Sequence, residues 1–174
     1  TIDPIIGKEL QKQAILALII ANIGMLIYIT FRFEFRSAIG AVLALIHDIL
    51  VIISFYAVFR IPVDGTFIAV ILTVIGYSIN DTIVIFDRIR ENMKFAKKQS
   101  FEETANISIS QTLKRTINTS LTTLITIVAL YFLGGETIKD FTLALIVGIL
   151  SGTYSSIFIA TPLWALLRPK HRTA

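Results

Sequence analysis

The chain has 174 residues, of which 55% are hydrophobic and 16% are charged, and its mean hydropathy is +0.77. A soluble domain of this length needs more charged surface, so a water-soluble globular protein is excluded. There is no cysteine, which excludes disulfide bonds, thiolate chemistry and cysteine metal sites. The net charge of +4 would suit nucleic acid, but the placement of the charges argues against that partner.

Five apolar stretches separate the charges. Each is close to the ~20 residues that cross a hydrocarbon core as a helix, at ~1.5 Å per residue. The second stretch contains one carboxylate, and the third contains two. The sequence therefore predicts an all-α membrane protein with five transmembrane helices. The stretches lie between Lys12 and Arg32, Arg36 and Arg60, Ile61 and Phe86, Arg115 and Glu136, and Asp140 and Arg168.

The first ten residues, 1–10, read as the end of an external region, and residues 168–174 form a cytoplasmic tail. Residues 91–113 are expected to be a cytoplasmic loop with a short amphipathic helix. Ser100 and Glu103 have capping-box spacing at its start, and this helix is either separate from the fourth membrane helix or continuous with it. The transmembrane helices are expected at about 11–31, 37–59, 66–90, 114–133 and 138–167.

The last of these helices carries two packing features. Gly148 and Gly152 are four residues apart, a spacing that lets another helix backbone approach closely. Pro162 predicts a kink near Phe158, because proline cannot continue the hydrogen-bond ladder of an α-helix.

Positive charges are divided unequally between the two sides of the predicted bundle. Twelve Lys and Arg residues, within 32–36, 88–115 and 168–174, share one side, and four lie on the other. The richer side is expected to be cytoplasmic, so the amino terminus is outside and the carboxyl terminus inside. An external amino terminus without a signal peptide is unusual for a whole protein. We therefore expect a fragment that lacks an earlier transmembrane helix and an external domain.

Asp48 lies at the middle of the second predicted helix. A carboxylate at that depth costs roughly 2.5–3.5 kcal/mol on insertion scales. In the neighbouring helix turn only His47 offers a polar partner. Two interpretations stay open: a neutral, hydrogen-bonded Asp that holds the bundle together, and a proton-relay or hinge group.

Asp81 lies within GYSINDTIVIFDR, with Tyr77 and Asn80 expected on the same helical face. If its helix starts near Gly65, Asp81 is ~24 Å along it and in the cytoplasmic half of a ~30 Å core. Burial disfavours an ionised carboxyl group and a nearby cation favours it. A buried Asp beside a movable cation can thus exchange a proton. The alternatives are a permanent ion pair or hydrogen bonds to neighbouring amides.

Arg115 opens the fourth helix at a depth similar to that of Asp81, so the two meet if the third and fourth helices are neighbours. Otherwise Arg115 is a basic flank of the membrane span. Thr119, Thr122 and Thr126 continue from Arg115 along one helical face. Their hydroxyl groups either join helices or line a wet path that feeds protons to Asp81.

Motifs for catalysis and cofactor binding are missing from the sequence. His47 and His171 are the only histidines, so no multi-histidine metal site is expected. There is neither a GxxxxGK[ST] phosphate loop nor a GxSxG elbow, and Asp48 and Asp81 lack a recognisable protease context. We expect no enzyme activity and no cofactor, with protons as the coupling ion.

Four ordered sequence blocks are IIGKEL (5–10), FRFEFRSAIGAVLALIHDIL (31–50), GYSINDTIVIFDRIREN (76–92) and RTINTSLTTL (115–124). Together they closely resemble SecF, the smaller partner of SecD, or the carboxyl half of a fused SecDF. This family belongs to the resistance–nodulation–division (RND) superfamily, whose halves carry six transmembrane helices with an external domain after the first. By this resemblance the chain corresponds to helices two to six of one half.

The resemblance implies an accessory subunit of Sec protein export that uses the proton-motive force to promote preprotein translocation. Asp81 matches the family's central transmembrane Asp, Arg115 its essential Arg, and Asp48 belongs to a family HD pair. The implied partners are SecD or a SecD half, the translocon channel, the preprotein and the lipid bilayer. The implied location is the bacterial or archaeal cytoplasmic membrane.

Two other functions stay open on the sequence. The first is an RND-type exporter half for small molecules or lipids, which a large substrate pocket inside the bundle would favour. The second is a passive structural subunit of the translocon.

Overall fold

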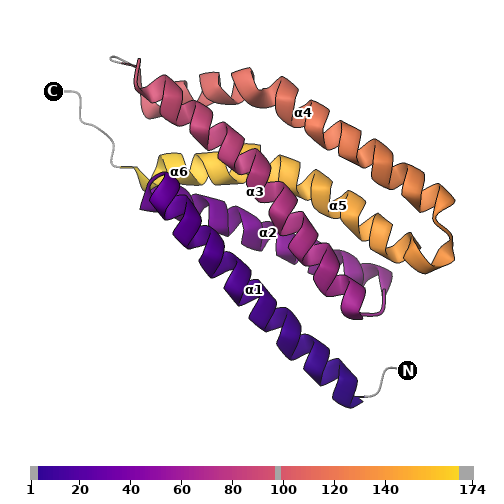
Figure 1. Ribbon diagram of the computed structural model, residues 1–174. Coiled ribbons are helices and arrows are strands. Elements are labelled where there is room, and N and C mark those ends of the chain that lie inside the picture. Colours follow the sequence, from indigo (N-terminus) through magenta and orange to yellow (C-terminus); the bar gives the residue numbers. More distant parts are fainter. Residues whose placement is uncertain (1–3, 97–98, 169–174) are drawn as a thin grey trace.

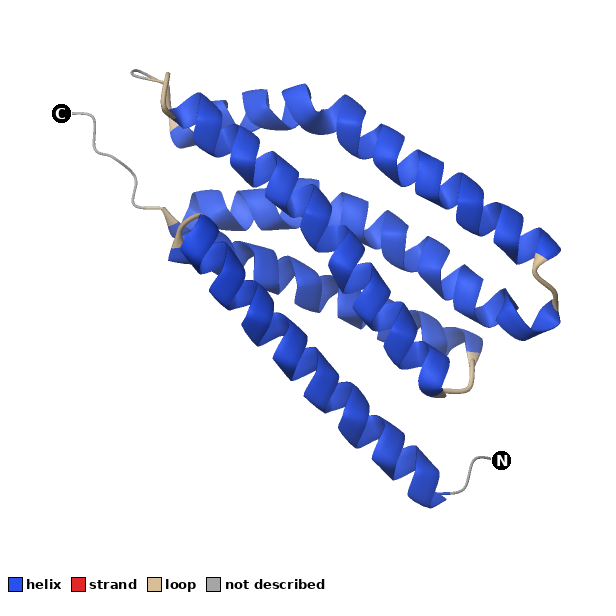
Figure 2. Ribbon diagram, viewed as in Figure 1, coloured by secondary structure: helices blue, strands red, loops and turns tan. Residues whose placement is uncertain are grey.

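The computed structural model describes residues 4–96 and 99–168, and within these ranges the chain is helical without any strand (Figure 2). Five helical segments there are long and apolar enough to cross a membrane, which confirms the predicted all-α fold. In chain order the elements are α1 (Pro4–Arg32), α2 (Phe35–Phe59), α3 (Gly65–Met93), α4 (Phe101–Leu133), the 3₁₀ turn η1 (Glu136–Ile138), α5 (Lys139–Ser155), the π-helix η2 (Ser156–Ala160) and α6 (Thr161–Leu167).

Consecutive long helices run antiparallel to one another (Figure 1). As a result, the α1–α2 turn, the α3–α4 connection and the end of α6 gather at one end of the bundle. The helix α5 is central and contacts α2, α3 and α4, whereas α1 contacts α2 and, less extensively, α3. The buried core therefore lies among α2, α3 and α5, where most of the large buried side chains are found.

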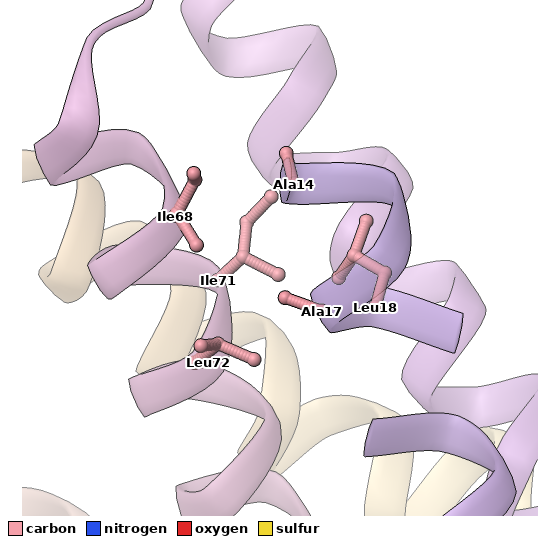
Figure 3. Close-up of a pocket in the computed structure, with 6 residues that line it drawn as sticks. All are labelled: Ala14, Ala17, Leu18, Ile68, Ile71 and Leu72. Atoms are coloured by element: carbon pink, nitrogen blue, oxygen red, sulfur yellow. The ribbon is translucent and has the colours of Figure 1, made fainter. Parts of the chain in front are cut away.

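A narrow gap between α1 and α3 is lined only by apolar side chains (Figure 3). It leaves no room for a water molecule. A site that selects small molecules needs polar groups to orient them, so this gap gives no support to the exporter alternative. The lining residues are Ala14, Ala17 and Leu18 from α1 and Ile68, Ile71 and Leu72 from α3.

The segment 91–113, predicted as a cytoplasmic loop with an amphipathic helix, is mostly helical, and of the two alternatives the structure has the continuous helix. The helix α3 continues to Met93, and α4 runs without a break from Phe101 to Leu133, so the predicted amphipathic helix is the first part of α4. No glycine or proline interrupts that stretch. The capping box is confirmed: the backbone N–H of Glu103 donates to Ser100 Oγ, and that of Ser100 donates to Glu103 Oε2, both at 3.1 Å.

The two ends of the chain also differ in part from the prediction. The helix α1 starts at Pro4 rather than near residue 11, and proline is favoured in the first helical turn. The remainder of the predicted external segment, residues 1–3, and the tail 169–174 lie outside the described residues.

The predicted irregularity near Phe158 is present as the π-helix η2. Pro162 has no N–H to donate to the carbonyl of Phe158, and its ring crowds that carbonyl. The hydroxyl group of Thr161 donates instead to the Ser156 carbonyl at 3.2 Å. On α2, a Cβ atom at Gly40 would lie 2.8 Å from the carbonyl oxygen of Ala160, so α2 approaches η2 closely.

Gly148 and Gly152 are the points where α5 approaches α3. A Cβ atom on Gly152 would lie 2.8 Å from the Cβ of Ser78, and one on Gly148 would overlap the side chain of Val74. The structure therefore places both glycines in the close helix contact that their spacing predicts.

An aromatic and ionic cluster ties the helices together at the end of the bundle where α6 ends. Trp164 packs against Phe86 and Phe101, with ring centroids 4.7 and 5.0 Å apart. The guanidinium group of Arg168 lies 4.6 Å from the Phe101 ring centroid and pairs with Glu34 at 2.7 Å. These contacts join the starts of α2 and α4 to the ends of α3 and α6.

Candidate functional site

Asp48 is fully buried at the centre of the bundle and accepts three serine hydroxyl hydrogen bonds. Its Oδ2 accepts from Ser78 of α3 and from Ser155 of α5, and its Oδ1 accepts from Ser151 of α5, each at 2.7 Å. We call Ser78, Ser151 and Ser155 the serine cluster. Through Asp48 this cluster joins α2, α3 and α5.

Local helix geometry explains how the serine cluster forms. Ser151 and Ser155 are one turn apart on α5, so both face α2, and Gly152 between them lets Ser78 come close. An interhelical hydrogen bond in a membrane is worth about 1–2 kcal/mol in model peptides. Three such bonds offset the ~2.5–3.5 kcal/mol cost of inserting the carboxyl group. The hydrogen-bonded interpretation of Asp48 thus matches its contacts.

His47 provides a fourth contact to Asp48, with Nδ1 3.2 Å from Oδ1. The histidine side chain is 37% exposed, whereas that of Asp48 is 0% exposed. The pair therefore extends from the core to the surface of the bundle.

Asp81 is also buried, at 2% exposure, but its surroundings differ from those of Asp48. Its Oδ2 is buried without any hydrogen-bond partner among the described residues. Its polar neighbours are Ser120 and Arg115 of α4. The Ser120 hydroxyl shares a 2.7 Å hydrogen bond with that of Thr153 on α5, so Asp81 lies where α3, α4 and α5 meet.

The expected contact between Asp81 and Arg115 is not formed. Within the part of the chain that the structure describes, no ion pair joins them, and Arg115 is exposed. The reason is helical geometry: Thr116 and Ser120 face inward, and Arg115 is rotated by about 100° from Thr116. Arg115 is nevertheless near enough to act electrostatically on the Asp81 carboxyl group.

The residues expected to share the Asp81 face are placed differently. Tyr77 is half-buried and donates to the hydroxyl of Thr123 at 3.2 Å, which links α3 to α4. Asn80 is exposed, so its grouping with Asp81 was wrong. Because successive helical residues point about 100° apart, Asp81 faces the core while Asn80 faces outward.

Thr119, Thr122 and Thr126 do not line the interior as a connected path. Their hydroxyl groups donate to carbonyls of their own helix at 2.9–3.1 Å, and Thr122 and Thr126 are exposed. The buried polar stripe of α4 is a different one, with four-residue spacing. The four-residue spacing of this stripe is visible in the sequence. Because α4 carries hydroxyl groups on several faces, the spacing alone does not show which of these faces is buried. The stripe consists of Thr104, Ser108, Thr112, Thr116 and Ser120.

Five membrane-length helices around two buried carboxyl groups define the class: a multi-pass membrane protein with ionisable groups inside the bundle. Comparison with known proteins makes this more specific. The chain belongs to the family "Protein export membrane protein SecD/SecF, C-terminal", which matches residues 1–170. This confirms the resemblance that the four sequence blocks indicated.

Individual relatives agree with the family assignment. The chain is 48% identical to the protein translocase subunit SecDF of Bacillus subtilis (strain 168), over 94% of this chain and 23% of that protein. It is 47% identical to the SecF subunit of Alicyclobacillus acidocaldarius, over 98% of this chain and 56% of that protein. The chain thus spans about half the length of this SecF relative.

A solved structure shares the fold. The crystal structure of SecDF in its super-membrane-facing form matches with a TM-score of 0.78 and 46% identity. The match covers 81% of this chain and 19% of that one. At this level of identity and coverage, most of the helix arrangement seen here is shared with part of that SecDF structure.

Proposed function

We propose that this chain is the membrane bundle of a SecF-type subunit that uses the proton-motive force to promote preprotein translocation. Its relatives are named as protein translocase subunits, which supports a role in transport rather than catalysis. The observation that carries the proton role is Asp81: a carboxyl group at 2% exposure whose Oδ2 has no partner among the described residues. Buried ionisable groups in membrane proteins commonly mark ion pathways.

The mechanism uses the charge of Asp81. Loss of its proton places negative charge on a carboxyl group whose Oδ2 has no hydrogen-bond donor among the described residues, which is costly in a low-dielectric interior. Arg115 is then attracted and α4 moves toward α3; protonation cancels the attraction and lets the helices separate again. One elementary charge crossing 100 mV yields about 2.3 kcal/mol, enough to bias such a two-state packing.

The polar outer face of α3 and α4 supports SecD as the partner. Asn80, Arg115, Asn118, Thr122 and Thr126 are exposed on this face. Polar groups that face lipid are costly, whereas helix–helix interfaces in membranes use them as contacts. A SecD half that covers this face would shield Arg115 together with the Asp81 site. The translocon channel and the preprotein are the further partners of this assembly.

The membrane and the orientation are also part of the proposal. The bundle lies in the cytoplasmic membrane with the α1–α2 turn, the α3–α4 connection and the end of α6 on the cytoplasmic side. The support is the unequal division of Lys and Arg residues that the sequence predicts, twelve on one side of the membrane and four on the other.

A passive structural subunit is the second candidate, and one observation favours it. Asp48 is held by the serine cluster, and such a hydrogen-bonded carboxyl group can serve packing alone. The two candidates differ in what they predict for Asp81.

Proton-driven translocation in vesicles tests the proposal. The full-length protein is reconstituted with SecD and the translocon, and translocation is measured with and without a pH gradient. Asp81→Asn keeps the size of the side chain but cannot ionise, and we expect it to abolish the stimulation by the gradient. Asp87→Asn is the matched control, because Asp87 is on the same helix and its ion pair among the described residues is with Arg32 at the end of the bundle. Undiminished stimulation in Asp81→Asn would favour the passive subunit.

A further inference from the structure

We infer that His47 and Asp48 form a second proton-binding site in this bundle, separate from Asp81, in which one proton is shared between His47 Nδ1 and Asp48 Oδ1. This inference rests on the proposed function in treating the bundle as proton-coupled, but it assigns a different pair of residues. The observations that carry it are the 3.2 Å contact between the two atoms and the exclusion of Asp48 from the surface.

The serine cluster leaves one position on the carboxyl group for this proton. A serine hydroxyl has a single proton to donate, and for each of the three the shortest contact, at 2.7 Å, is to Asp48. The Ser155 hydroxyl also lies 3.2 Å from the Gly152 carbonyl oxygen. The remaining contact of Oδ1 is with His47 Nδ1. A hydrogen bond forms there whether the proton is bound to nitrogen or to oxygen. The pair can therefore gain or lose a proton without breaking a serine hydrogen bond.

The proton balance of the pair has two states. When the carboxyl group is ionised and neutral imidazole carries its proton on Nδ1, the pair has a charge of −1 by count. A proton that arrives at Nε2 forms an Nε2–H bond, the Nδ1–H bond breaks, and an Oδ1–H bond forms. The imidazole stays neutral and the pair becomes uncharged, which is the less costly state in a low-dielectric interior.

His47 is the part of the site that reaches the surface of the bundle. Its side chain is 37% exposed while Asp48 is inaccessible, so a proton can enter or leave only through the imidazole. In the described part of the chain, no further charged side chain is hydrogen-bonded or ion-paired to either residue. Their hydrogen-bond partners from neighbouring helices are Ser78 of α3 and the other two serines of α5. The ring centroid of Tyr154 on α5 lies 6.4 Å from that of His47.

This arrangement gives the two buried carboxyl groups different tasks. Asp48 has its hydrogen bonds in place before and after proton exchange, so its site changes charge with little movement. Asp81 Oδ2 has no hydrogen-bond partner in the part of the chain that the structure describes, so its ionisation requires α4 to rearrange. A proton at His47–Asp48 changes the charge of the core beside Ser78, which is one helical turn from Asp81 on α3.

Infrared difference spectroscopy tests the inference directly. The full-length protein with SecD is reconstituted in lipid bilayers, and the C=O band of protonated carboxyl groups is followed from alkaline to acidic pH. We expect Asp48→Asn to remove a component that persists in Asp81→Asn. We expect His47→Gln to shift the pH midpoint of the Asp48 component by about one unit or more, a tenfold change in proton affinity. Tyr154→Phe, which removes no proton from the pair, should leave the midpoint in place.

Two results would overturn the inference: an Asp48→Asn spectrum that lacks no component, or an Asp48 component whose midpoint is the same in His47→Gln. If Asp48→Asn does not fold, the component that persists in Asp81→Asn is followed in its place, and a midpoint of that component that is unchanged in His47→Gln overturns the inference. His47 is 37% exposed and is not one of the serine donors to Asp48, so this substitution leaves the serine cluster in place. The outcome is independent of the translocation assay. If no Asp48 component is found, the proposed role of Asp81 is unaffected. If Asp81→Asn translocates normally, the inferred His47–Asp48 site is unaffected.

Discussion

Gly152 of α5 lies directly against Ser78 of α3, so closely that a Cβ atom on the glycine would come within 2.8 Å of the Ser78 Cβ and 3.2 Å of its Oγ. The same Ser78 hydroxyl donates to Asp48 at 2.7 Å. Ser78 therefore takes part both in the packing of α5 against α3 and in the hydrogen bonding of the buried Asp48 carboxyl group. A substitution at Gly152 that displaces Ser78 should thus weaken the hydrogen bond to Asp48.

Gly152→Ala is expected to destabilise the bundle by about 1–3 kcal/mol, the usual cost of overpacking a filled interior. The added methyl group must displace Ser78 and so weakens its hydrogen bond to Asp48. Thermal unfolding of the purified protein measures this as a lower Tm. Gly76→Ala is the control, since nothing lies within 4 Å of a Cβ there. An equal Tm for the two variants would contradict the close contact.

Removal of the Asp48 carboxyl group should cost more than removal of any single donor. Asp48→Ala leaves the hydroxyl groups of Ser78 and Ser151 without their Asp48 acceptor, at about 1–3 kcal/mol for each buried unsatisfied group, whereas that of Ser155 keeps the Gly152 carbonyl at 3.2 Å. Ser155→Ala removes one interhelical hydrogen bond, worth about 1–2 kcal/mol. Chemical denaturation in mild detergent ranks the variants, with Ser54→Ala, an exposed serine of the same helix as Asp48, expected to match the wild type. A larger loss in Ser155→Ala than in Asp48→Ala would refute this ranking.

Arg115→Gln should impair proton-driven translocation while leaving the stability of the bundle nearly unchanged. Arg115 is exposed and makes no ion pair within the described residues, so its replacement is expected to change the unfolding free energy by no more than about 0.5 kcal/mol. Its charge is needed to respond to Asp81, so stimulation of translocation by a pH gradient should be lost.

The matched control for Arg115→Gln is Lys114→Gln, the adjacent exposed basic residue. Both substitutions remove one positive charge from the same end of the bundle, so a general effect of charge on orientation would appear in both. Equal translocation by the two variants would remove Arg115 from the mechanism.

The helices could be predicted from the sequence because hydrocarbon thickness sets the length of the charge-free stretches. The buried state of Asp48 and Asp81 followed from their places within those stretches. The donors to Asp48 could not be predicted: Ser78, Ser151 and Ser155 are 30, 103 and 107 residues away. Periodicity within a helix does not say which helices are neighbours, so only the packing of α2, α3 and α5 identifies them.

The inward face of α4 shows a second limit of periodicity. Thr122 and Thr126 have the same four-residue spacing as Thr116 and Ser120, and the hydroxyl groups of Ser120, Thr122 and Thr126 all donate to carbonyls of the preceding turn. A helix that is polar on several sides has no apolar stripe that fixes its rotation. The rotation is set by contact with α3 and α5, which turns Ser120 inward and leaves Arg115 outside.

Arg168→Ala is expected to loosen the end of the bundle where four helices meet. The guanidinium group lies over the Phe101 and Trp164 rings, 4.6 and 5.7 Å from their centroids, and pairs with Glu34 at 2.7 Å. Cation–π contacts at exposed sites contribute about 0.5–1 kcal/mol and an exposed ion pair up to about 1 kcal/mol. The loss in unfolding free energy should therefore be about 1–2 kcal/mol.

The dependence on salt concentration distinguishes the two ways in which Arg168 stabilises the bundle, the ion pair with Glu34 and the contact with the aromatic rings. Ion pairs at the surface weaken as ionic strength rises, whereas an Arg side chain over aromatic rings also loses packing when it is truncated. The difference between the wild type and Arg168→Ala should thus shrink in high salt without vanishing. Arg36→Ala, at an exposed arginine that forms no ion pair with any described residue, is the control and should unfold like the wild type. A difference that disappears entirely in salt would mean that the rings contribute nothing.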